Sequence, residues 1–193
     1  MRLQIFAVAV AIAKLCSAAL ANETYKFDRS GSTIGFTVHQ YLGTTHGKFA
    51  RFDGRIDLDR EQPEKSSVAA RIDVRSIDTG IKKRDDHLCS PEFFNVAKFS
   101  EITFKSHSVK QTGQQSGDIL GDLTMHGVTR PITLHVKLLS PVSNDTKQTR
   151  WAVTTEPIKR REFNLMFGQS AEAISGIGQT VAINIEIEAT RAQ

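Results

Sequence analysis

Cysteine is scarce in the sequence, and we expect no disulfide bond within the mature chain. Only Cys16 and Cys89 are present among 193 residues, and Cys16 lies in an N-terminal segment that we expect to be removed. A secreted chain with a single remaining cysteine has no internal disulfide, so its fold depends on an apolar core. Cys89 follows Leu88, and a lone cysteine in this context is more often a small buried apolar residue than a reactive thiol.

The sequence also lacks an apolar run long enough to cross a membrane as a helix. The apolar stretch that starts at Leu3 is interrupted by Lys14, well short of the about 20 residues that a membrane-spanning helix needs. Arg2 precedes this stretch, and the small-residue pattern Ala-Leu-Ala follows it at 19–21. This arrangement is typical of a cleaved secretory signal peptide.

We therefore divide the chain into a signal peptide at residues 1–21 and a single domain at residues 22–193, which is long enough to form its own core. An uncleaved N-terminal anchor is the alternative. A lipoprotein signal that ends before Cys16 is a poorer fit, because Leu15 occupies the position where that cleavage needs a small residue.

A large excess of one charge is absent as well. Removal of residues 1–21 takes away Arg2 and Lys14, which leaves 23 Lys and Arg against 21 Asp and Glu, a net charge of about +2. A nucleic-acid-binding protein would need a basic patch with interleaved aromatic residues. The short basic clusters at 82–84 and 159–161 do not form one, so we expect no nucleic-acid partner.

Motifs for metal binding or catalysis are missing too. None of the six histidines has a second histidine three or four residues away, the spacing that zinc sites on helices use. There is no G-x-S-x-G nucleophile motif. Asp85-Asp86-His87 contains acid–base groups, but neighbouring residues on a helix diverge by about 100°. We expect Asp85 and Asp86 to pair with Lys82, Lys83 or nearby backbone, and we predict no catalytic residue, metal or cofactor.

Alternation of apolar and polar residues is what the chain has in abundance. Nine segments show it, with apolar side chains on one face and charges on the other; they span 24–28, 32–40, 51–59, 67–75, 101–109, 117–125, 131–139, 150–160 and 180–190. Such segments form antiparallel sheets that bury one face and expose the other. An outer-membrane barrel would need the charged face to fill its lumen, and that face is too densely charged for a small one. A soluble barrel and a β-sandwich both fit the pattern.

Residues 81–99, "IKKRDDHLCSPEFFNVAKF", interrupt the alternation. We expect two short helices here. The first would place Ile81 and Leu88 inward, and the second would start at Ser90-Pro91-Glu92, a favourable helix N-terminus, with Phe93 and Phe94 inward. Together they would cover one end of the sheet structure.

The blocks "RDDHLCSPEFF" and "GDLTMHGVTRPITL", with "FDRSGSTIGFTVHQ" upstream and "IKRREFNLMF" downstream, resemble the YceI family from about Tyr25 to Arg191. This resemblance implies an all-β fold, an extended antiparallel eight-stranded lipocalin-like barrel with short helices capping one end. It also implies an elongated apolar pocket that binds a long-chain polyisoprenoid or similar lipid in the periplasm, without catalysis. Cys89 departs from the family, because many relatives carry a polar residue there.

The inward positions of the predicted strands, together with the Phe pair that we expect to gate the pocket, are candidates for lipid contact. Arg160 is a candidate for a phosphate head group, because the arginine fork matches phosphate oxygens; with Arg161 it could equally be a surface basic pair. We predict that the ligand-binding residues are Ile34, Phe36, Val38, His39, Phe52, Phe93, Phe94, Phe104, Leu123, Met125, Arg160 and Phe167.

Two other functions stay open at this point. One is an enzyme that acts on a lipid-soluble substrate through His87 or Cys89, and the other is an envelope-stress or interaction module whose pocket is incidental. The expected partner is a long-chain lipid; a transient membrane contact and a homodimer remain open.

Overall fold

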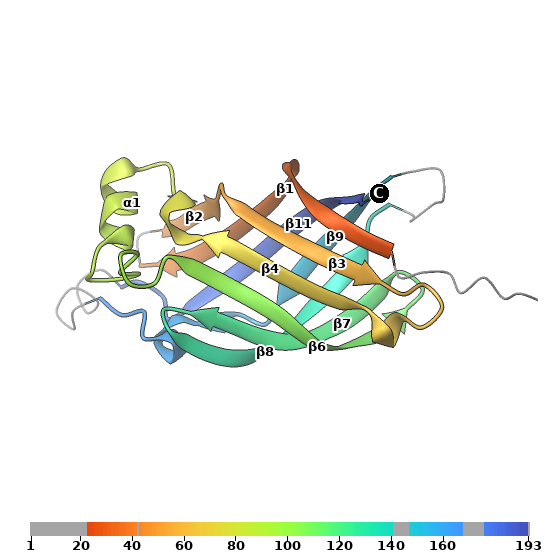
Figure 1. Cartoon of the computed structure of the whole chain (residues 1–193). Coiled ribbons are helices and arrows are strands. Elements are labelled where there is room, and N and C mark those ends of the chain that lie inside the picture. Colours follow the sequence, from red (N-terminus) through yellow and green to blue (C-terminus); the bar gives the residue numbers. More distant parts are fainter. Residues whose placement is uncertain (1–22, 42, 141–146, 168–175, 193) are drawn as a thin grey trace, which may run out of the picture.

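Antiparallel strands close on themselves into a barrel in the computed structural model, which describes residues 23–41, 43–140, 147–167 and 176–192 (Figure 1). The expected signal peptide at 1–21 and Cys16 lie outside the described residues. The ring closes where the first strand pairs with the last. In spatial order its eight strands are β1 (Glu23–Gln40), β3 (Phe52–Leu58), β4 (Ser67–Asp73), β6 (Glu101–Gly113), β7 (Ser116–Met125), β8 (Val128–Leu138), β9 (Gln148–Thr155) and β11 (Thr180–Arg191). The predicted eight-stranded barrel is confirmed.

Three short strands extend the sheet at one end of the barrel: β2 (Gly43–Phe49), β5 (Ile77–Asp78) and β10 (Ile158–Lys159). β3 pairs only with residues 23–26 of β1, and β2 pairs with residues 34–40 of the same strand. A register shift between Asp28 and Thr33 separates these two halves of β1. We predicted the halves as two strands and missed β2, whose sequence "GTTHGKF" alternates only weakly.

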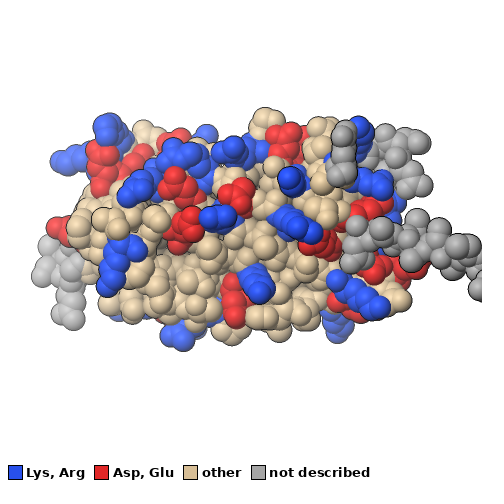
Figure 2. All heavy atoms as spheres, in the orientation of Figure 1, with Lys and Arg blue, Asp and Glu red and all other residues tan. Residues whose placement is uncertain are grey.

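The alternation places apolar side chains inside the barrel and charged side chains outside it. Arg71 on β4 shows the outer pattern, since its guanidinium lies 3.8 Å from Asp53 on β3 and 3.3 Å from Glu101 on β6. Figure 2 shows Lys and Arg interspersed with Asp and Glu over this face. Exposed pairs of this kind contribute only about 0–1 kcal/mol each, so the apolar interior supplies most of the stability.

Residues 81–99 cover one end of the barrel with a single helix, α1 (Lys82–Cys89), followed by consecutive turns (Figure 1). The prediction of a second helix that starts at Ser90-Pro91-Glu92 is wrong, because these residues and those that follow form turns. The amide of Asn95 bonds to the carbonyl of Ser90 (2.8 Å) and that of Phe94 to Leu88 (3.0 Å), and Asn95 itself adopts a positive φ of 48°. In this turn geometry both Phe93 and Phe94 are buried.

The start of α1 also differs from the expectation. Ile81 is its N-cap residue and is 52% exposed, so it does not face inward, whereas Leu88 packs against the core. Three 3₁₀ turns complete the described structure: η1 (Pro63–Lys65), η2 (Val74–Ser76) and η3 (Arg160–Phe163). No helix in the described part of the chain is long and apolar enough to cross a membrane.

The opposite end of the barrel holds a cluster of polar residues around Tyr25, a fully buried side chain. The Glu23 carboxylate accepts hydrogen bonds from the Tyr25 hydroxyl and from Arg60, and it lies 3.2 Å from Arg191. Burial alone would raise the pKa of Glu23, but these donors and positive charges outweigh it and lower the pKa below its usual value. The cluster ties the first and last strands together where the ring closes.

Candidate ligand-binding cavity

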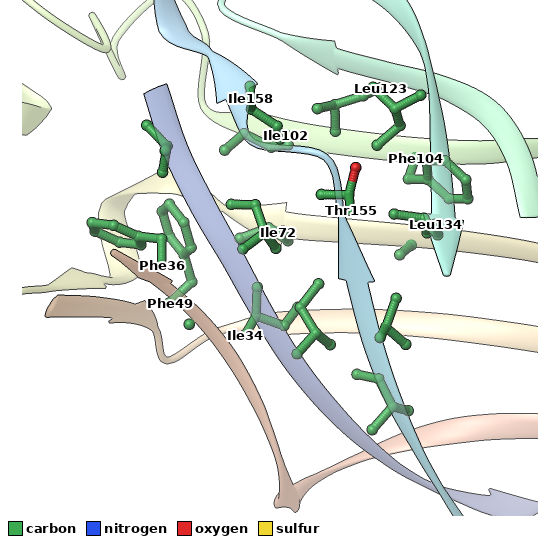
Figure 3. A pocket seen from close by; sticks show the side chains of 18 of the residues that line it. Ile34, Phe36, Phe49, Ile72, Ile102, Phe104, Leu123, Leu134, Thr155 and Ile158 are labelled. Carbon is green, nitrogen blue, oxygen red and sulfur yellow. The ribbon is translucent and has the colours of Figure 1, made fainter. Parts of the chain in front are cut away.

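The barrel encloses a cavity of about 470 Å³ whose walls are almost entirely apolar. Figure 3 shows Ile34, Ile72, Phe104 and Leu134, which come from different strands, directed into the same space. Cavities that hold small molecules in proteins have volumes of roughly 300–1,000 Å³ and mostly apolar linings. This cavity has both properties.

All but two of the predicted ligand-binding residues line this cavity. Those that do are Ile34, Phe36, Val38, Phe93, Phe94, Phe104, Leu123, Met125, Arg160 and Phe167. His39 lies between the inward-facing positions 38 and 40 of β1; its side chain is therefore outside the barrel, where its Nδ1 lies 3.1 Å from Thr44 Oγ1. Phe52 is 5% exposed and belongs to the same core cluster as Ile34 and Phe93, but it does not line the cavity.

Three phenylalanines form an aromatic cluster at the α1 end of the cavity. Phe93 stacks on Phe167 with ring centroids 4.4 Å apart and meets Phe94 edge to face at 5.1 Å. Phe93 and Phe94 are each only 7% exposed. Aromatic pairs with such geometry add about 0.5–1.5 kcal/mol to the gain from burial. The cluster therefore forms a well-packed part of the cavity wall next to α1.

Arg160 is buried in the cavity wall rather than placed on the surface. It is 3% exposed, its Nε donates to the carbonyl of Gly178 (2.9 Å), and its Nη1 donates to the carbonyl of Leu165 (2.8 Å). These bonds connect η3 to the chain before β11. The guanidinium thus holds the backbone at this end of the cavity.

Sequence reasoning missed the polar residues that line the α1 end of the cavity. They are Gln40, Thr45, Thr79, Arg84 and His87. Gln40 continues the inward series 34, 36 and 38 of β1, so the alternation could have identified it. Arg84 and Leu88 are one helical turn apart and share the inner face of α1, which was the available signal for Arg84.

The opposite end of the cavity is also polar, but its polar side chains belong to exposed segments. They are Ser66 after η1 and the residues around the β6–β7 hairpin, Gln111, Gln114, Gln115 and Ser116. None of these carries a charge. The two ends of the cavity therefore differ both in charge and in exposure.

The groups considered for catalysis are engaged in structural contacts. The Asp85 carboxylate accepts a hydrogen bond from the Thr79 amide (3.0 Å), and Asp86 pairs with Lys82 at 2.8 Å, as we expected for these two carboxylates. His87 Nε2 lies 2.8 Å from the Glu92 carboxylate. Among the described residues, no group of three or more His, Cys, Asp or Glu could hold a metal ion.

Cys89 is half-buried and packs against the core. Burial raises the pKa of its thiol, and the carboxylates of Asp85 and Asp86 raise it further. Because the thiolate is the reactive form, this environment lowers the fraction of the thiol that is reactive. The interpretation of Cys89 as a small apolar residue fits this position.

Comparison with known proteins identifies the family. The model of the YceI-like domain matches residues 25–189. The chain belongs to the YceI family. Curated YceI proteins of Salmonella arizonae and Salmonella paratyphi B are each 40% identical to it over 146 residues, which cover 73% of this chain and 75% of theirs.

Solved structures support the YceI fold as well. BcnA of Burkholderia cenocepacia superposes with a TM-score of 0.77 at 24% identity, covering 85% of this chain and 99% of its own. The YceI protein of Campylobacter jejuni has a TM-score of 0.64 at 25% identity, with coverages of 76% and 85%. A polyisoprenoid-binding domain of Saccharophagus degradans has a TM-score of 0.65 at 19% identity, with coverages of 87% and 98%.

Proposed function

We propose that this YceI protein is a non-catalytic binding protein that holds a long-chain isoprenoid or a similar amphiphilic lipid in the barrel cavity. It would sequester or carry this lipid in the periplasm after removal of residues 1–21. The observation that carries the proposal is the apolar cavity of about 470 Å³ inside the closed barrel.

The lipid tail would supply most of the binding free energy. Burial of a methylene group contributes about 0.8 kcal/mol, so a five-carbon isoprene unit contributes roughly 3–4 kcal/mol before costs. Ordering a flexible chain offsets much of this gain. Affinity would then increase with tail length until the cavity is full, and the cavity would select its ligand mainly by length and width.

The comparisons support the same class of ligand. The Saccharophagus degradans domain with this fold is a polyisoprenoid-binding domain. The catalytic alternative through His87 or Cys89 has less support, because the exposed His87 ring is engaged with the Glu92 carboxylate at 2.8 Å, and the Cys89 thiol has a raised pKa.

Native mass spectrometry of the protein purified from its own periplasm, followed by solvent extraction, tests the proposal. We expect one long-chain amphiphile per protein molecule. Two tryptophan variants provide matched controls: Ala70 faces the cavity, and its neighbour Ala69 is exposed on the outer face of the same strand. Ala70→Trp should abolish the co-purified lipid, and Ala69→Trp should retain it.

The proposal is wrong if the protein is empty and polyprenols of graded length, added in vitro, fail to bind. It is also wrong if Ala70→Trp folds and binds the lipid as the wild type does. Recovery of the protein without a mature N-terminus near residue 22, or from a compartment other than the periplasm, would contradict the proposed location.

A further inference from the structure

The apolar walls of the cavity leave the head group of an amphiphile unaccounted for. We propose that Arg84 and Thr45 form a subsite at the α1 end of the cavity that binds an oxyanion head group, phosphate or carboxylate, and that Thr79 holds Arg84 in place. This inference rests on the proposed function, because it concerns the polar end of the lipid that the cavity would hold.

Arg84 is positioned by three separate elements. It lies on α1, its Nε donates to the Thr79 hydroxyl (2.7 Å) and its Nη2 to the Thr79 carbonyl (2.8 Å), just after β5. Its Nη1 lies 3.3 Å from the hydroxyl of Thr45 on β2. These contacts hold the half-buried guanidinium at the cavity wall in one orientation.

The same contacts leave part of the guanidinium without an acceptor. Arginine carries five N–H donors, and three of those of Arg84 are directed at Thr79 and Thr45. Within the described part of the chain, no carboxylate forms an ion pair with Arg84 at 4.0 Å or less. The nearest acid in sequence, Asp85, bonds to Thr79.

Thr45 adds a further donor that is available to a ligand. Its Oγ1 already accepts hydrogen bonds from Gln40 Nε2 (2.7 Å) and from Arg84. The hydroxyl proton of Thr45 has no acceptor among the residues described. A hydroxyl that accepts twice can still donate once, so this proton and the remaining guanidinium protons can bond to a ligand at the α1 end.

An oxyanion satisfies this arrangement better than a neutral group does. A half-buried cation beside apolar walls has lost part of its hydration, and a partner of opposite charge restores that loss. Charge-assisted hydrogen bonds are also about twice as strong as neutral ones, and the planar guanidinium matches phosphate and carboxylate oxygens. Arg160 is less suited to this role, because its guanidinium donates to backbone carbonyls.

The test compares two ligands that share a tail: a polyprenyl phosphate and the polyprenol of equal length. The single tryptophan, Trp151, lines the cavity, so its fluorescence can report binding of both to the full protein. We expect the phosphate to bind at least about tenfold tighter, as hydrogen bonds to charged groups imply. Arg84→Gln should remove this preference and leave polyprenol affinity within about twofold. Lys83→Gln, at the exposed neighbouring position on α1, should change neither.

A second variant and a second ligand pair sharpen the result. Thr45→Val, which removes only the hydroxyl, should reduce the preference for the phosphate severalfold without affecting the polyprenol. If the subsite binds oxyanions in general, a fatty acid should also bind more tightly than the alcohol of equal chain length. Inorganic phosphate alone should not displace the bound lipid, since the tail supplies most of the affinity.

The possible failures are distinguishable. Equal binding of phosphate and polyprenol by the wild type would overturn the subsite and leave lipid binding intact, and this comparison needs no variant. An equal loss of both ligands in Arg84→Gln would mean that Arg84 only braces the Thr79 turn, which also overturns the subsite. Failure of both ligands to bind the wild type would refute the proposed function itself.

Discussion

The two ends of the barrel differ in how the chain closes them. At the α1 end, a helix, turns and the short strand β2 extend beyond the barrel wall and place half-buried polar groups, among them Arg84 and Thr45, next to an aromatic cluster. At the opposite end the strands themselves close the ring around Tyr25 and Glu23. The cavity reaches solvent-exposed, uncharged residues of the β6–β7 hairpin there.

This difference separates ligand recognition from barrel closure. Strand pairing is satisfied by the backbone, so the closing end needs side chains only for stability. The α1 end combines short strands with a helix and turns, and the helix and turns bring side chains such as Arg84 to the cavity from outside the barrel wall. We therefore expect changes at the α1 end to affect the ligand, and changes at the opposite end to affect mainly stability.

The largest effect should come from the aromatic cluster. Phe94→Ala removes a 7% exposed ring, and such a change costs about 3–5 kcal/mol of the free energy of unfolding. Urea denaturation measures this loss. Ligand release should also become faster in a stopped-flow assay, because the wall beside α1 loses an aromatic side chain.

Tyr41→Ala is the matched control. Tyr41 directly follows β1 at the α1 end of the barrel, and its side chain is 82% exposed. It should change the free energy of unfolding by no more than about 0.5 kcal/mol. Unchanged ligand retention in both Phe93→Ala and Phe94→Ala would refute the gating role of the Phe pair.

A smaller effect, limited to stability, should come from Glu23 at the opposite end. Its pKa is lower in the folded protein than in the unfolded chain, so its contribution is fully present above the unfolded pKa and is lost as the pH falls through the folded value. Glu23→Gln should cost about 1–2 kcal/mol at pH 7 and should weaken the dependence of stability on pH in the acidic range.

Urea midpoints measured from pH 7 down to pH 3 check this expectation. Glu64→Gln, on the exposed η1 turn, serves as the control and should leave the pH profile unchanged. Lipid affinity at pH 7 should be the same in Glu23→Gln and the wild type. A large loss of affinity would mean that closure and recognition are not separate.

The same division explains what could be predicted from sequence. In β11, Ile183, Ile185 and Ile187 alternate with polar residues, and that periodicity is sufficient to assign a strand. The charges on the other face identify the isoleucine face as the inner one. The barrel walls were predictable in this way, and the family motifs distinguished a barrel from a sandwich. β2 was missed because its stability comes from pairing with β1 and β5 rather than from its own pattern.

The α1 end was harder to predict because its structure depends on contacts between distant segments. Ser90-Pro91-Glu92 is a favourable local helix start, yet the chain forms turns there, with a bond from the Asn95 amide to the Ser90 carbonyl and a positive φ at Asn95. Arg84 lines the cavity only because β2 and the turn after β5 supply its acceptors. The periodicity within one segment does not predict that α1, β2 and the turn after β5 come into contact.

A modest effect should appear in the reactivity of Cys89 at the α1 end. The raised pKa of its thiol and its half-buried position should make alkylation by iodoacetamide at pH 8 at least several-fold slower in the folded protein than in urea. Peptide mass spectrometry can follow the alkylation of Cys89. Alkylation as fast in the folded protein as in urea would show that the α1 end opens readily to solvent.

The smallest effect should come from the hairpin end of the cavity. Gln114 is exposed and uncharged, and surface changes of this kind stay within about 0.5 kcal/mol, which corresponds to roughly twofold in affinity. Gln114→Ala should therefore bind polyprenyl phosphate and polyprenol almost as the wild type does, in the Trp151 fluorescence titration. A tenfold loss for the phosphate alone would place the head group at the hairpin instead. The tail would then point toward Phe93 and Phe94, and the functions that we assign to the two ends would be reversed.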